Sequence, residues 1–147
     1  MRMLRRIGLA FMALVMVLGM CVPAMVEAAP DPANLSFRTE NADGALLLSG
    51  SDVTCVGLAG APDDAPAVGP NVRLVFDGSH RQRLSEVTTA HVGEKIAIVL
   101  NGKVLMAPVL RDPITGGEVV VYGEQGWDAR ALRDTIHRDA GVPLCPA

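Results

Sequence analysis

The chain has 147 residues, with 13 Lys and Arg against 16 Asp and Glu, so its formal net charge is −3. Three of the basic residues and one of the acidic residues lie in the first 28 positions, which leaves the remainder at about −5. This acidic balance argues against a nucleic-acid partner, because phosphate contacts need a positively charged footprint. The hydrophobic fraction is 50%, but the apolar N-terminal run raises it, so it does not indicate a membrane-embedded protein.

The N-terminus has the three parts of a secretory signal peptide. Arg2, Arg5 and Arg6 precede an apolar run at residues 7–22, and small residues follow up to Ala28. The apolar run is shorter than the roughly 20 residues that a membrane-spanning helix needs. We therefore expect residues 1–28 to be a signal, cleaved after about Ala28, and the mature chain to be exported to the periplasm or the extracellular space.

Three other readings of this N-terminus remain open. An uncleaved anchor is the main competitor. Residues 18–21 resemble a lipoprotein box ending at Cys21, although Met20 is larger than the small residue expected before the cysteine. The Arg5-Arg6 pair is reminiscent of a twin-arginine signal, but Gly8 stands where such a signal has a bulky apolar residue. Any membrane contact is thus expected only through the signal or a lipid on Cys21.

Two cysteines remain after removal of the signal, Cys55 and Cys145. In an exported chain such a pair usually forms a disulfide. The bond would tie the C-terminal tail to the first strands. The alternative is one buried thiol and one free thiol in the tail. Neither cysteine has a C-x-x-C partner, so a catalytic or metal role is not indicated.

Residues 29–70 are expected to hold short strands and a loop. Strands are predicted at 35–38 and 45–48, around an Asn-Ala-Asp-Gly turn, and a further extended segment at 52–58. The Pro- and Gly-rich run at 60–70 reads as a surface connector. Because the segment before it is too short to fold alone, residues 29–70 are assigned to the same domain as the rest.

The next strand and helix follow from clear periodicity. Residues 72–76 alternate apolar and polar side chains, which predicts a strand. Ser79 is a plausible helix N-cap, and Gly93 stands where a C-terminal glycine of a helix would. The helix predicted at 80–91 presents one face, made of Leu84, Val87, Thr88 and His91.

Asn101-Gly102 is the strongest hairpin signal in the chain. It joins apolar runs at 96–100 and 103–107, and Pro108 stops the second run because proline cannot donate to the ladder. Since both runs are apolar at nearly every position, we expect the hairpin to lie centrally, covered on at least part of both faces.

The last elements are a strand at 118–122 and a helix at 128–140, with Trp127 at its start and an apolar stripe made of Leu132, Ile136 and Ala140. Gly141 ends this helix. Together the elements predict an α+β fold, a mostly antiparallel sheet with two helices packed on one face.

No catalytic or metal-binding pattern stands out. His80, His91 and His137 lack a second ligand type at metal spacing, and the serines lack a nucleophile-elbow context. We therefore expect no enzyme activity, no cofactor and no metal, while an enzyme of unrecognised type stays open.

Several segments in order resemble the head subdomain of the first periplasmic domain of SecD and SecDF. They are Leu-Ser-Glu-Val-Thr at 84–88, the run at 93–108 that contains the Asn-Gly turn, Pro-Ile-Thr-Gly-Gly at 113–117 and Val-Tyr-Gly at 121–123. The resemblance covers about residues 71–140 and implies a head-like core at 71–147. Cys55 and Cys145 are not part of the family pattern.

The resemblance implies an exported, non-catalytic module that contacts unfolded or translocating polypeptide or an export component. The chain has no multi-span membrane region that would carry over the family's proton-driven function, and fold alone does not transfer function. A partner contact is predicted at an exposed strand edge or at the loop formed by Asp112, Pro113, Ile114, Thr115, Gly116 and Gly117. The alternative function is a structural or interaction subunit of an envelope complex unrelated to export.

Overall fold

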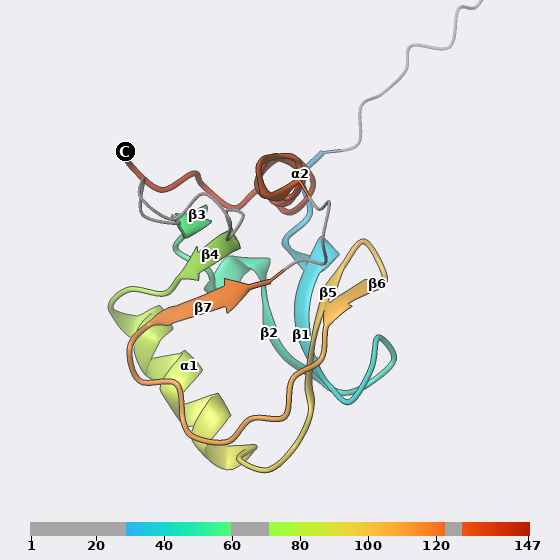
Figure 1. Ribbon diagram of the computed structural model, residues 1–147, viewed down its shortest axis with the longest axis vertical. Helices are drawn as coiled ribbons and strands as arrows, with labels where there is room; N and C mark the ends of the chain where they lie inside the picture. Colours follow the sequence, from blue (N-terminus) through green and yellow to red (C-terminus); the bar gives the residue numbers. More distant parts are fainter. Residues whose placement is uncertain (1–28, 60–70, 123–127) are drawn as a thin grey trace, which may run out of the picture.

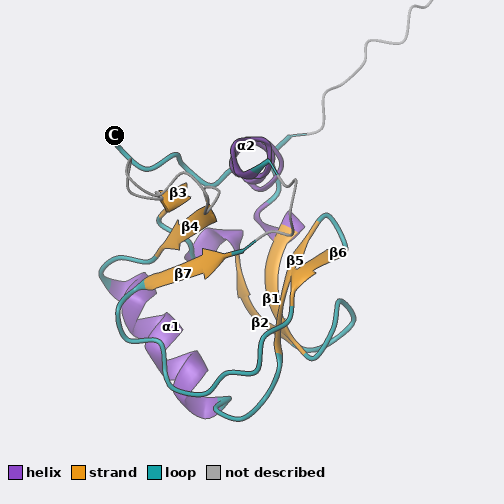
Figure 2. Cartoon of the chain, in the orientation of Figure 1, coloured by secondary structure: helices purple, strands orange, loops and turns teal. Residues whose placement is uncertain are grey.

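The computed structural model describes residues 29–59, 71–122 and 128–147, and Figures 1 and 2 show their arrangement. The predicted signal peptide with Cys21, the predicted loop at 60–70 and Trp127 lie outside the described residues. Among the described residues no helix is both long and apolar enough to cross a membrane.

The first sheet, called sheet A, joins the N-terminal strands to the predicted hairpin. Its strand order is β2-β1-β5-β6, with β2 at Leu46–Ser49, β1 at Leu35–Thr39, β5 at Ile96–Leu100 and β6 at Lys103–Met106. All neighbours are antiparallel. β1 and β5 pair over their full lengths, from Leu35 opposite Leu100 to Thr39 opposite Ile96. The first two strands of the chain, β1 and β2, are therefore an integral part of this sheet.

The second sheet, sheet B, is antiparallel and has the order β3-β4-β7. β3 spans Cys55–Ala59, β4 spans Asn71–Val75 and β7 spans Glu118–Val121. The C-terminal tail adds one parallel bridge on the outer side of β3, between Val56 and Leu144.

In the described parts of the chain, two helices and two short 3₁₀ turns complete the fold. The helices are α1 at Ser79–Ala90 and α2 at Ala129–Ala140, and the 3₁₀ turns are η1 at Pro32–Asn34 and η2 at Gly50–Asp52. The Asp128 side chain caps α2 by accepting from the N–H groups of residues 130 and 131, and Gly141 ends the helix at φ 67°. The N-cap of α1 is Gly78 at φ 55°, so the expectation that Ser79 caps this helix is wrong, and Ser79 is its first residue.

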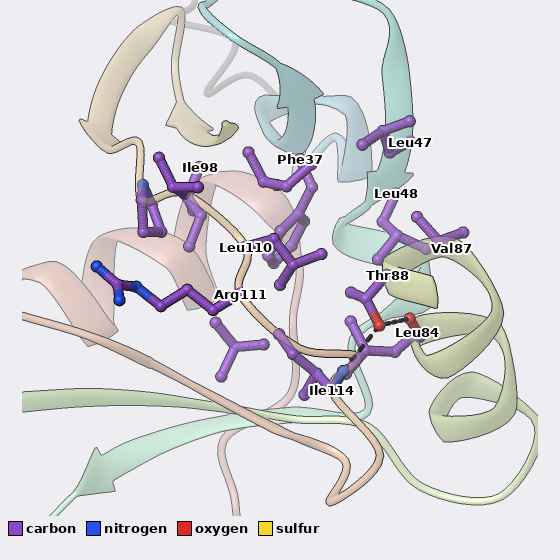
Figure 3. A pocket seen from close by; sticks show the side chains of 14 residues that line it. Phe37, Leu47, Leu48, Leu84, Val87, Thr88, Ile98, Leu110, Arg111 and Ile114 are labelled. Carbon is purple, nitrogen blue, oxygen red and sulfur yellow. Dashed lines mark hydrogen bonds between the residues drawn. The ribbon is translucent and has the colours of Figure 1, made fainter. Parts of the chain in front are cut away.

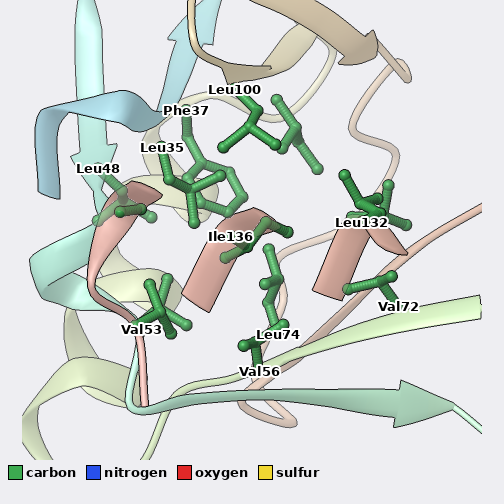
Figure 4. Close-up of a cluster of buried hydrophobic side chains, with 14 of the residues drawn as sticks. Leu35, Phe37, Leu48, Val53, Val56, Val72, Leu74, Leu100, Leu132 and Ile136 are labelled. Atoms are coloured by element: carbon green, nitrogen blue, oxygen red, sulfur yellow. The ribbon is translucent and has the colours of Figure 1, made fainter. Parts of the chain in front are cut away.

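Both sheets and both helices share one hydrophobic core (Figure 4). Phe37 of β1 and Phe76, which follows β4, meet edge to face with ring centroids 6.0 Å apart. Leu84 of α1 and Ile136 of α2 are fully enclosed in the same cluster. Aromatic pairs in this geometry add about 0.5–1.5 kcal/mol beyond the area they bury. The Phe37–Phe76 contact therefore helps to join the two sheets.

The predicted α+β class is confirmed. The strands are divided between two sheets because β4 pairs with β3 and β7, and not with β5. Of the two helices, α2 contacts β3 and β4 of sheet B.

The Asn101-Gly102 turn joins β5 and β6, with φ at 51° and 79°. β5 is covered on both faces, since four successive residues, 97–100, are buried. β6 differs, because it is the edge strand of sheet A and Val104 is 37% exposed. The expectation that both hairpin strands lie centrally is therefore correct for β5 and wrong for β6.

A disulfide joins Cys55, the first residue of β3, to Cys145 in the tail, across a sequence separation of 90 residues. Two backbone hydrogen bonds flank it. The Val56 N–H donates to the Pro143 carbonyl at 2.8 Å, and the Cys145 N–H donates to the Val56 carbonyl at 2.9 Å.

Replacing both cysteines, Cys55→Ala with Cys145→Ala, is expected to lower the free energy of unfolding by roughly 3–4 kcal/mol, because the bond restricts a long loop in the unfolded chain. Urea unfolding followed by circular dichroism measures the change. The wild-type chain under reducing conditions is the matched control and should give the same midpoint. An unchanged midpoint in both would contradict this assignment of the disulfide's contribution.

Candidate functional site

The most distinctive surface feature is an apolar cavity of about 310 Å³ (Figure 3). It lies between sheet A, helix α1, the segment that follows β6, and Val119 of β7. Its volume is at the lower end of the roughly 300–1,000 Å³ typical of ligand pockets. We take this cavity as the candidate site.

Sheet A supplies one wall through residues on its inner face. Phe37 pairs with Leu48 on β2 and with Ile98 on β5, so the three side chains lie side by side across the strands. Each is at most 3% exposed. Because successive side chains of a strand point to opposite faces, this wall follows directly from the alternation in β1 and β5.

Helix α1 supplies the facing wall with Leu84, Val87 and Thr88. Residues three and four apart share a helix face, and Figure 3 shows these three side chains directed at the cavity. This face is the one predicted from the sequence.

The segment from Pro108 to Arg111 covers the cavity beside the start of β5. It is held by backbone bonds to residues 93–96. The Ile96 N–H donates to the Pro108 carbonyl at 3.0 Å, the Leu110 N–H donates to the Glu94 carbonyl at 2.8 Å, and the Gly93 N–H donates to the Leu110 carbonyl at 2.7 Å. An irregular segment is thereby fixed over the apolar wall.

One hydroxyl joins the helix wall to the loop beyond. Thr88 Oγ1 donates to the Leu84 carbonyl at 2.8 Å and accepts from the Ile114 N–H at 2.9 Å. Thr88 is 5% exposed, and the only other lining residue with a polar side chain is Arg111, which is exposed. The single donor proton of the Thr88 hydroxyl and one of its acceptor positions are thus used inside the protein. The cavity therefore suits an apolar guest, because a polar group placed there would lose its hydrogen bonds to water without gaining new ones.

An apolar residue of the lining is open to solvent. Val109 lines the cavity and is 50% exposed. Because a lining residue is half-exposed, a guest can reach the cavity from solvent at Val109.

The loop predicted as a partner contact is only partly at this site. Ile114 points into the cavity, while the side chains of Asp112, Pro113 and Thr115, together with Gly116, are exposed. Gly117 is buried, and its carbonyl accepts from the Phe76 N–H at 2.8 Å.

Of the three predicted turn and stop residues, only Pro108 lies at the cavity. Asn101 and Gly102 form the hairpin tip, where the Asn101 side-chain N–H donates to Asp139 at 2.8 Å. The hydrogen bond from Arg138, followed by that from Asn101, holds the pKa of Asp139 below its usual value. This contact ties the hairpin tip to the end of α2.

The rings of His91 and His137 have local partners. His91 Nδ1 lies 2.7 Å from Glu94 Oε2, and His137 Nδ1 lies 2.8 Å from the Val142 carbonyl oxygen. Within residues 29–59, 71–122 and 128–147, no group of three or more His, Cys, Asp or Glu side chains is placed to hold a metal ion.

The sheet wall and the covering segment were not predicted as a site. The apolar run at 96–100 indicated a covered strand, but it gave no sign that a space would remain between sheet A and α1. Pro108 was interpreted only as a strand stop. The apolar character of the next two residues, Val109 and Leu110, is the signal in the sequence that could have pointed to a cover over the core.

Two antiparallel sheets and two helices around one core define a small α+β module. The chain belongs to the family of SecDF P1 head subdomains, whose family model matches residues 36–135. The match begins in β1, at residue 36, whereas the resemblance visible in the sequence begins at about residue 71. This agrees with the place of β1 inside sheet A.

Individual relatives are subunits of a protein translocase. The chain is 39% identical over 106 residues to SecDF of Thermus thermophilus, covering 69% of this chain and 13% of the relative. It is 40% identical over 87 residues to SecD of Acetobacter pasteurianus, covering 59% of this chain and 16% of the relative. The chain thus spans only a small part of these curated relatives.

Solved structures show the same relationship. One is of SecDF, described as a membrane component that enhances protein export. It superposes with a TM-score of 0.62 at 25% identity, over 77% of this chain and 66% of that chain. SecDF in a super-membrane-facing form gives a TM-score of 0.55 at 30% identity, over 68% of this chain and 13% of that chain.

Replacing Thr88→Val is expected to lower the free energy of unfolding by about 1–2 kcal/mol, because the part-buried Ile114 N–H loses its acceptor. Amide hydrogen exchange at Ile114 should also become faster. Thr89→Val is the matched control, because the exposed Thr89 hydroxyl donates only to the Ser85 carbonyl, at 2.7 Å. Equal effects of the two substitutions on Ile114 exchange would show that Thr88 does not hold the loop.

Proposed function

We propose that this chain is an exported, non-catalytic module that binds extended segments of unfolded or translocating polypeptide, with an apolar side chain of the segment in the cavity. Membership of the SecDF P1 head family and the translocase relatives support a role beside the export machinery. The N-terminal signal pattern supports export. An N-terminal sequence beginning near residue 29, on protein recovered from the cell envelope, tests that step.

The observation that carries the proposal is the chemistry of the cavity. Its walls are apolar, the Thr88 hydroxyl is already paired on both sides, and exposed Val109 lies at its opening. Such a site selects for apolar side chains without requiring a particular polar pattern. That lack of polar discrimination fits a partner whose sequence varies, as polypeptides in transit do.

The expected affinity is modest. Burying one Leu, Ile, Val, Phe or Met side chain contributes about 1.5–3 kcal/mol, which corresponds to roughly a 10- to 150-fold change in the equilibrium constant. One filled cavity therefore gives a transient contact. A module that must release its guest is better served by such a contact than by tight binding.

The position of the cavity also allows backbone contacts to the guest. β2 is an edge strand of sheet A, and its residues Leu47 and Leu48 line the cavity. An extended segment added to an exposed sheet edge gains main-chain hydrogen bonds, while pockets receive its alternate side chains. We propose that the guest lies along β2 with one side chain in the cavity.

The proposal that the module is non-catalytic rests on the two polar residues that line the cavity, Thr88 and Arg111. The Thr88 hydroxyl donates its proton to a backbone carbonyl, and the exposed guanidinium of Arg111 has hydrogen-bond donors but no acceptor. Neither group is set up as a base or an activated nucleophile.

Val109→Asp is expected to weaken binding of an unfolded polypeptide at least tenfold, because it places a charge at the apolar entrance. The probe is reduced, carboxamidomethylated lactalbumin, and binding is measured by titration calorimetry or fluorescence anisotropy.

Val104→Asp is the matched control. Val104 is also an exposed valine, at 37%, but it pairs with Val99, whose side chain points to the face of sheet A opposite Ile98 and the cavity. It should leave binding within about twofold of wild type, because it lies on the other face. If the two variants lose affinity equally, or if the wild-type chain does not bind the probe, the cavity is not a polypeptide site.

A further inference from the structure

The C-terminal tail pairs with the outer edge of β3 in the way that an added strand would. Both backbone groups of Val56 point away from β4 and bond to the tail, the N–H to the Pro143 carbonyl and the carbonyl to the Cys145 N–H. Leu144 is thereby the parallel partner of Val56. The geometry is that of strand addition to a sheet edge, and it shows that this edge accepts a parallel strand.

Apart from the disulfide, the tail pairs only weakly with β3. Val142 is buried and its carbonyl oxygen lies 2.8 Å from His137 Nδ1, so the chain is anchored up to that point. Beyond it Leu144 is 45% exposed, and the prolines at positions 143 and 146 cannot donate to a ladder. From residue 143 onward the pairing consists of two backbone hydrogen bonds and the covalent bond at Cys145.

The outer edge of β3 has backbone hydrogen-bonding groups that the tail does not pair with. Backbone N–H and C=O groups of alternate residues point to the same side of a strand, so those of Leu58 point outward like those of Val56. Within the described part of the chain, neither of these Leu58 groups has a hydrogen-bond partner. Gly57 between them has no side chain, and a β-carbon placed there would lie 3.4 Å from the Cys145 Cβ. The departing tail would thus leave room over Gly57.

We propose that the outer edge of β3 is a second polypeptide-binding site, closed by the tail while the Cys55–Cys145 disulfide is intact and opened when a dithiol reduces that bond. In this exchange the dithiol supplies two electrons and two protons. Cys55 and Cys145 become thiols, and the dithiol becomes a disulfide. Among the described residues, the tail beyond Val142 is then held by its two backbone hydrogen bonds to Val56.

The guest that fits this site is an extended, proline-free segment running parallel to β3. Such a segment can repeat both tail bonds to Val56 and also pair with the N–H and C=O groups of Leu58. Without the disulfide the tail still competes, because a tethered segment acts at a high effective concentration. The additional bonds at Leu58 favour the guest over the tail.

This site goes beyond the proposed function and is independent of it. It lies at β3, the edge strand of sheet B next to β4, whereas the cavity is lined by sheet A, α1, the segment after β6 and Val119 of β7. Val109→Asp should therefore leave binding at β3 unchanged, and reduction should leave binding at the cavity unchanged.

The test uses a fluorescein-labelled peptide of sequence KTVTLTVK with the full chain in its oxidised form, its reduced form and the Cys55→Ser, Cys145→Ser form. Anisotropy should show at least tenfold tighter binding to the reduced and substituted forms than to the oxidised form. Amide shifts on peptide addition should be largest at Val56 and Leu58. The same peptide methylated on alternate backbone nitrogens, which cannot donate to the edge, should not bind any form.

Each other outcome overturns the proposal. Equal binding to the oxidised and reduced forms would place the peptide at another edge. Binding of the methylated peptide would show that side chains, and not strand pairing, hold the guest. Loss of the circular dichroism spectrum of the fold on reduction, which is measured first, would show that the disulfide is required for folding and is not a closure.

Discussion

The continuous antiparallel pairing of β1 with β5 is the interaction on which the rest of the structure depends. Five successive residue pairs, from Leu35 with Leu100 to Thr39 with Ile96, bring the N-terminal part of the chain into the same sheet as the Asn-Gly hairpin. The pairing sets Phe37 beside Ile98, which makes the sheet wall of the cavity, and directs the Phe37 ring to Phe76 at the end of β4. Without it the hairpin would be a two-stranded ribbon, which is marginal in water.

The cavity exists because the apolar faces that this pairing brings together do not fill the space between them. Sheet A and helix α1 each present an apolar face, and the segment after β6 covers the space between them without filling it. Thr88 connects the helix to that covering region through a hydroxyl whose hydrogen bonds are both made inside the protein. Binding at such a site is therefore driven by apolar burial, and the guest's backbone can be held separately at an edge strand. On this account the protein has two polypeptide-binding sites. One is the cavity at sheet A, which stays accessible, and the other is the outer edge of β3, which the tail closes.

Much of the fold could be predicted because local signals and tertiary structure agree. Asn101-Gly102, the alternation at 72–76 and the stripe of α2 each specify an element by short-range chemistry. The division into two sheets could not be predicted, since strand partners depend on contacts between residues far apart, such as Val72 with Val121. The edge position of β6 was missed for the same reason, because its apolar sequence resembles that of a central strand. The candidate site was harder to predict than the fold. The family resemblance led to Ile114 as a predicted contact. The cavity itself arises because several packed faces leave a space between them, and no periodicity in the sequence encodes such a space.

The central claim is that the cavity receives an apolar side chain of an extended polypeptide. The most direct measurement is a methyl-resolved NMR titration of the oxidised full-length protein with an unfolded, alkylated polypeptide. The account predicts saturable shifts of the Leu48, Ile98 and Ile114 methyl groups, together with contacts to the guest's apolar side chains, and no change at Val104. Shifts confined to Val104 and other residues away from the cavity, or no shifts under conditions in which the polypeptide remains soluble and unfolded, would contradict it.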